Sequence, residues 1–133
     1  MKLTRRSFSK LAGTGLLAAA SPRIFSLAQD KPLRIGIIAP RSGAAGTAGE
    51  CGSRAVQWAT ERMNKDGGIA GRQFELVFEE ETNPKDTIER LRRLILQEKV
   101  DAIHGLISTG VSLGVAPVAE EEQALVVMWD GTT

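Results

Sequence analysis

The chain has 133 residues, of which 42% are hydrophobic, and its formal net charge at neutral pH is +1. This balance leaves no basic face concentrated enough for binding nucleic acid. The single cysteine, Cys51, excludes an internal disulfide and a cysteine-pair metal site. We expect Cys51 to be a small buried residue, and no metal or cofactor is predicted.

The N-terminus has the pattern of an export signal. Residues 4–10 read TRRSFSK and lead into an apolar run, residues 11–20, that is too short to cross a bilayer. A charged segment, a short apolar segment and a small-residue cleavage site are the parts of a secretory signal. The pair Arg5 and Arg6 favours the twin-arginine type and its export machinery, while an ordinary secretory signal stays an alternative. Either type exports the chain to the periplasm, so residues 1–28 are predicted to be a cleaved signal.

Residues 29–133 are predicted to be the mature part. Loss of the signal removes five basic residues and no acid, so 17 basic against 16 acidic residues become 12 against 16, a net charge of about −4. No second apolar run is long enough for a membrane span. Because turn-forming residues follow the last expected strand, we expect this part to continue into further elements.

The first predicted element after the signal is a strand, Leu33–Ala39, whose β-branched residues are typical of a parallel strand covered on both faces. Residues 42–52 are predicted to form a glycine-rich loop. They lack the glycine and lysine pattern of a phosphate site, so a loop close to a small ligand is the preferred interpretation. A helix is predicted over about residues 51–64. Its apolar positions recur every four residues, at Cys51, Ala55, Ala59 and Met63, with Trp58 beside them.

Strands and helices alternate through the rest of the chain. Further strands are predicted over Phe74–Phe78, Ala102–Ile107 and Leu125–Trp129. This alternation predicts an α/β fold in which a parallel sheet is flanked by helices.

Two more helices are predicted between these strands. The first has Asn83 as its cap and Pro84 at its first position, and its buried stripe is predicted to be Ile88, Leu91 and Ile95. The second runs through residues 111–119, where Pro117 predicts a kink or a late helix start.

One motif suggests catalysis. Residues 110–114 match the GxSxG letters of a hydrolase nucleophile turn. However, Ser112 comes five residues after Ile107, so we expect it inside a helix, and the only histidine, His104, precedes it. A hydrolase that uses Ser112 is therefore a remote alternative, and His104 is expected to be a packed core residue.

Two acidic runs are interpreted as solvated faces. Glu79–Glu81 lies between a strand and a helix start, and Glu120–Glu122 lies at a helix end. Neither is predicted to be a metal site or an acid–base pair.

The candidate ligand site lies at the carboxyl ends of the strands, where open parallel sheets bind ligands. Ser108 and Thr109 stand at a helix start, where their side chains and free backbone amides suit a ligand carboxylate. Asp130, or its carbonyl, is predicted to face an ammonium group.

The mature chain resembles the branched-chain amino acid and amide binding proteins of ABC transporters, the Leu/Ile/Val-binding type. The stretches that carry this resemblance are LRIGIIAPRSG, MNKDGGIAGRQFELVFEEETNPKDT and DAIHGLISTGVSLGVAPVAEEEQALVVMWDGTT. The most specific part is NKDGGIAG, residues 64–71, because such proteins carry a close variant between their first helix and second strand.

The resemblance implies a type I periplasmic binding protein fold, of which this chain supplies part of the N-terminal lobe. It implies that Thr109 and Thr132 hold the ligand's carboxylate, that Asp130 meets its ammonium group and that Ser42 lines the same cleft. Trp129 and Asp130 stand where many relatives have small residues, which leaves the ligand open between an aliphatic amide, an aromatic acid and another small solute.

The function implied is that of an extracytoplasmic solute-binding protein. It captures a branched-chain amino acid, an amide or a similar small solute for an ABC permease, without enzymatic activity, and is expected to be a monomer at full length. The alternative is a sensory ligand-binding module on the same fold.

Overall fold

The computed structural model describes residues 31–130, and its centre is one sheet of four parallel strands. The strands are β1 (Leu33–Ala39), β2 (Phe74–Glu80), β3 (Ala102–Gly105) and β4 (Val126–Met128), in the spatial order β2-β1-β3-β4. The predicted parallel α/β sheet is confirmed. The predicted signal, with Arg5 and Arg6, and the predicted ligand residue Thr132 lie outside the described residues.

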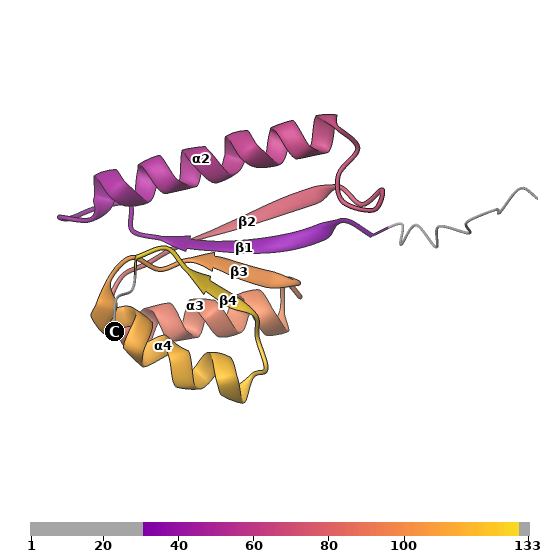
Figure 1. Ribbon diagram of the computed structural model, residues 1–133. Coiled ribbons are helices and arrows are strands. Elements are labelled where there is room, and N and C mark those ends of the chain that lie inside the picture. The colour runs from indigo at the N-terminus through magenta and orange to yellow at the C-terminus, as the bar shows by residue number, and fades with distance from the viewer. Residues whose placement is uncertain (1–30, 131–133) are drawn as a thin grey trace, which may run out of the picture.

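Within residues 31–130, three helices cover the sheet from both sides (Figure 1). Helix α2 (Gly46–Lys65) lies over β1 and β2 on one face, while α3 (Pro84–Leu96) and α4 (Thr109–Glu121) pack side by side on the other. Among the helices of residues 31–130, none combines the length and the apolar character that a membrane crossing requires.

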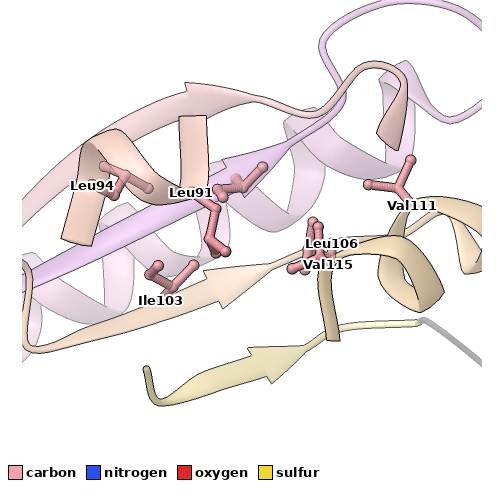
Figure 2. Close-up of a cluster of buried hydrophobic side chains, with 7 residues drawn as sticks. Leu91, Leu94, Ile103, Leu106, Val111 and Val115 are labelled. Carbon is pink, nitrogen blue, oxygen red and sulfur yellow. The ribbon is translucent and has the colours of Figure 1, made fainter. Parts of the chain in front are cut away.

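The core lies between the sheet and the α3–α4 layer. Figure 2 shows apolar side chains of both helices meeting those that follow or belong to β3. Full burial of a leucine or isoleucine side chain contributes about 1.5–3 kcal/mol. The buried residues of this cluster are Ile38, Leu91, Leu94, Ile103, Leu106, Val111 and Val115.

Helix α2 begins at Gly46, earlier than predicted, and turns a different side to the sheet. The predicted glycine-rich loop is therefore wrong from Gly46 onward. A Cβ atom added at Gly49 would lie 2.0 Å from the carbonyl oxygen of Pro40, so the helix packs through its glycines. The apolar side chains expected to be buried are exposed instead, namely Cys51, Ala55, Trp58 and Met63, with Ala59 half-buried.

The start of α3 is as predicted. Asn83 caps it through its side-chain oxygen, which accepts a hydrogen bond from the Asp86 amide at 3.0 Å, and Pro84 occupies the first position. Of the predicted buried stripe, Leu91 is buried, whereas Ile88 and Ile95 are only partly buried. The other buried residues of α3 are Thr87 and Leu94.

Helix α4 already begins at Thr109, with Pro117 inside it. Of the two alternatives predicted for Pro117, a kink or a late helix start, the late start is therefore wrong.

Candidate functional site

The loops that leave the carboxyl ends of the strands carry the predicted ligand residues. Ser42 and Asp130 are exposed, and Ser108 and Thr109 are half-buried. The amide of Asp130 lies 3.5 Å from the carbonyl oxygen of Leu106, so the end of β4 lies beside the turn between β3 and α4. The structure thus places Asp130 beside Leu106, two residues before Ser108, whereas Ser42 stands on the separate loop between β1 and α2.

Glu81 joins the ends of β2 and β3. It is 4% exposed, and its two carboxylate oxygens accept hydrogen bonds from the amides of Ile107 at 2.7 Å and Ser108 at 2.8 Å. Hydrogen bonds to a charged carboxylate are stronger than neutral ones, and the start of α4 favours the negative charge.

Two predictions are corrected by these contacts of Glu81. Glu81 does not belong to a solvated face, because its side chain is buried. A buried carboxylate requires hydrogen-bond partners, and the two amides of the turn are those partners. The amide of Ser108 is not free for a ligand carboxylate, because Glu81 already occupies it.

The backbone between β3 and α4 has an unusual conformation. Gly105 has a φ of 137° and Leu106 a φ of 61°. A Cβ atom at Gly105 would lie 2.0 Å from the carbonyl oxygen of Ile38, and the amide of the fully buried Leu106 donates to that oxygen at 2.8 Å. A bulky residue in the left-handed region is strained and persists only where its surroundings impose it. The turn is therefore fixed by its neighbours rather than by its own preference.

The first turn of α4 follows directly. Ser108 stands at the N-cap position, and its side chain makes no capping hydrogen bond. The amides of Thr109, Gly110 and Val111 have no carbonyl one turn earlier in the helix to bind, and the helix dipole favours a negative group there. An anionic ligand group consequently fits the chain from Thr109 onward, one residue later than the amide of Ser108.

A cleft of about 590 Å³ opens between α2 and the ends of β3 and β4. Its volume is within the range of small-molecule sites. Of the predicted ligand residues, Asp130 lines it, and the rest of its wall is mostly apolar, which suits the apolar body of a small solute. The other lining residues are Ala48, Gly52, Ala55, Val56, His104, Ile107, Met128 and Trp129.

His104 and Trp129 form a pair in the wall of this cleft. The indole Nε1 of Trp129 donates a hydrogen bond to Nδ1 of His104, and the ring centroids are 5.5 Å apart with an interplanar angle of 62°. The six-membered ring of the indole also fills the space above Gly52, where an added Cβ would lie 2.2 Å from it.

Burial lowers the pKa of His104 from its ordinary value of 6.5. A neutral imidazole is the form that accepts the indole hydrogen bond. Sequence reasoning missed this pair, because the parallel register that sets His104 beside Val127, two residues before Trp129, is a long-range property.

Ser112 lies inside α4, as expected from its distance to the strand, and is 1% exposed. Its hydroxyl has no hydrogen-bond partner within residues 31–130. A nucleophile must be reached by its substrate, so a hydrolase that uses Ser112 has no support in this geometry. In the same part of the chain, no three histidine, cysteine or acidic side chains gather where they would share a metal ion.

Comparison with known proteins gives the following matches. The sequence profile of the periplasmic binding protein family matches residues 32–133. The chain is 30% identical over 104 residues to Leu/Ile/Val-binding protein homolog 3 of Brucella melitensis, which covers 77% of this chain and 28% of that protein. It is 28% identical over 127 residues to an amino acid binding protein of Pseudomonas aeruginosa, which covers 93% of this chain and 34% of that protein. The chain thus spans about a third or less of the length of these relatives.

Two solved structures share the arrangement of strands and helices. The branched-chain amino acid transporter substrate-binding protein of Streptococcus pneumoniae, in complex with isoleucine, matches with a TM-score of 0.72 and 23% identity over 77% of this chain and 30% of that one. A solute-binding protein of an R. palustris ABC transporter, in complex with 4-hydroxybenzoate, matches with a TM-score of 0.67 and 28% identity over 78% of this chain and 28% of that one. Both matches confirm the predicted fold.

Proposed function

Since this chain belongs to the periplasmic binding protein family, we propose that it captures a small solute outside the cytoplasm and delivers it to an ABC permease. The observation that carries the proposal is the position of the Ser108–Thr109 turn and Asp130 at one edge of the sheet, beside an apolar cleft. Binding and release make or break no covalent bond, so the protein acts without a cofactor and not as an enzyme.

The ligand's carboxylate is proposed to bind at the first turn of α4. Glu81 already occupies the amide of Ser108. The next donors along the chain are the amide and the hydroxyl of Thr109, which follow the side chain of Ser108 at the start of α4. Thr132 is proposed to add a second hydroxyl, Asp130 to meet an ammonium group and Ser42 to line the entrance.

The proposed ligand class is a small carboxylate or amide with an apolar body, such as a branched-chain amino acid. His104 and Trp129 form aromatic walls of the cleft, and Ile107, which also lines it, stands two residues before Thr109 in the chain. One end of the ligand is therefore proposed to be bound by hydrogen bonds at the start of α4 and the other by apolar contact in the cleft. Isoleucine and 4-hydroxybenzoate, the solutes named for the two similar structures, both have a carboxylate joined to an apolar body.

Delivery outside the cytoplasm is proposed to depend on the twin-arginine pair. Replacing Arg5 and Arg6 with lysines should leave the protein in the cytoplasm when cell fractions are compared by immunoblotting. Undiminished export of that variant would point to the ordinary secretory route.

The binding function is tested by a thermal-shift screen of the full-length protein against amino acids, amides and small aromatic acids. A ligand at about 100 times its Kd stabilises the native state by about 2.7 kcal/mol, which raises the unfolding temperature measurably. Failure of every solute to raise it would contradict the proposal.

A matched pair of variants then locates the ligand. Thr109→Val removes the proposed hydroxyl donor while keeping the shape, and should weaken binding of a screened ligand by about 1 kcal/mol, or roughly fivefold. Thr82→Val, at an exposed position after β2, serves as the control and should bind normally.

A further inference from the structure

We propose that Glu81 is a positioning residue for the ligand, which holds the turn between β3 and α4 in the conformation that presents Thr109. The proposal rests on the proposed function above, because it names what sets the geometry of that same site. Glu81 itself is 4% exposed and directly follows the last residue of β2, so it acts through the turn rather than by touching the ligand.

The burial of Glu81 and the conformation of the turn depend on each other. A carboxylate taken out of water needs hydrogen-bond donors, and both of its oxygens find one, at 2.7 Å on the amide of Ile107 and at 2.8 Å on the amide of Ser108. Two consecutive amides reach one carboxylate only if both point to the same side of the chain. That arrangement follows directly on the left-handed Leu106.

The turn is strained at Leu106, and Glu81 is one of the groups that hold it in this conformation. Leu106 has a φ of 61°, a region that a bulky side chain leaves unless contacts hold it. Burial of the leucine side chain and three hydrogen bonds do so, namely the bond of its amide to the Ile38 carbonyl and the two bonds to Glu81 from the next two residues. Without the carboxylate, residues 107 and 108 lose their anchor and Thr109 loses its fixed position.

A purely structural role would have a different signature. If Glu81 only tied β2 to β3, its loss would lower the unfolding temperature but leave the affinity of the folded protein unchanged. If it positions the turn, affinity falls even where the variant is fully folded, and the two bonded amides exchange with solvent faster than their neighbours.

The test uses the full-length protein with Glu81→Gln and the control Glu80→Gln. Glutamine at position 81 keeps the size, but its NH₂ group faces one of the two amides instead of an acceptor. Glu80→Gln removes the same charge one residue earlier, where the carboxylate has no hydrogen bond to the turn among the described residues. Calorimetric affinities for L-isoleucine and 4-hydroxybenzoate are measured at a temperature where circular dichroism shows both variants folded, and amide exchange is followed by NMR.

We expect Glu81→Gln to bind the probe that the wild type binds at least about tenfold more weakly. The amides of Ile107 and Ser108 should exchange at least about tenfold faster, and Glu80→Gln should show neither change. Wild-type affinity or wild-type exchange in Glu81→Gln overturns the proposal. If the wild type binds no solute at all, the proposed function fails, whereas the exchange rates still decide whether Glu81 holds the turn.

Discussion

The contact between α2 and the end of β1 makes a quantitative prediction for Gly49→Ala. A Cβ atom at this position would lie 2.0 Å from the carbonyl oxygen of Pro40 and 2.9 Å from two carbons of its ring. The oxygen belongs to the backbone, so it does not move aside as a flexible side chain does. The helix must shift away from the sheet instead, at the point where α2 packs most closely.

Two opposing effects determine the size of the change. Alanine is a better helix former than glycine by up to about 1 kcal/mol, whereas overpacking a closely packed contact costs about 1–3 kcal/mol and more in severe cases. Because 2.0 Å is far inside van der Waals contact, we expect the upper end of that cost. The net loss in the free energy of unfolding should be about 2 kcal/mol.

Urea unfolding followed by circular dichroism measures this loss. Gly110→Ala is the matched control, because an added Cβ there meets no atom within 4 Å, and it should stabilise the protein slightly or leave it unchanged. A Gly49→Ala variant as stable as the wild type would refute the close approach of α2 to Pro40.

Three further predictions concern the core, a cap and a histidine. Leu94→Ala should lower the free energy of unfolding by about 2–5 kcal/mol in urea titrations, since the side chain is fully buried, and a loss below about 1 kcal/mol would contradict the described packing. Asn83→Ala should cost about 0.5–2 kcal/mol in the same assay by removing the acceptor for the Asp86 amide. Because burial lowers the pKa of folded His104 below 6.5, the unfolded state binds its proton more readily, so stability should fall as the pH drops below about 6.5. The unfolding temperature of His104→Gln should fall less over that interval, and an equal fall would exclude the histidine as a cause.

The strands and the start of α3 follow from local sequence. The bounds of β1 are those predicted, because an apolar run with β-branched residues between Pro32 and Pro40 favours a strand. The cap at Asn83 is equally local, since an acceptor side chain before a proline favours the start of a helix.

The orientation of α2 was not predictable from its apolar residues. The expected buried side contained Cys51, Ala55 and Met63, but the helix turns glycines to its neighbours and leaves those side chains exposed. Glycine adds no hydrophobic signal, so a pattern of apolar residues does not register a contact that depends on the absence of a side chain.

The burial of Glu81 was also not predictable from local sequence, so Glu81 was assigned to the surface. A charged residue in an acidic run is normally solvated. The amides that donate hydrogen bonds to the Glu81 carboxylate lie more than twenty residues away in sequence. Only the pairing of β2, β1 and β3 brings them together.

At the carboxyl edge of the sheet, the residues that support the turn differ from those proposed to contact the ligand. The carbonyl of Ile38 in β1 and the carboxylate of Glu81 directly after β2 hold the turn, whereas Thr109 at the start of α4 and Asp130 after β4 are the residues proposed to contact the ligand. Because the supporting groups are buried and the proposed ligand residues are not, substitutions at Thr109 and Asp130 should leave the supporting groups undisturbed. Under the proposed function, ligand preference therefore varies most readily at Thr109 and Asp130, whereas loss of the Glu81 carboxylate weakens the binding of each of these ligands.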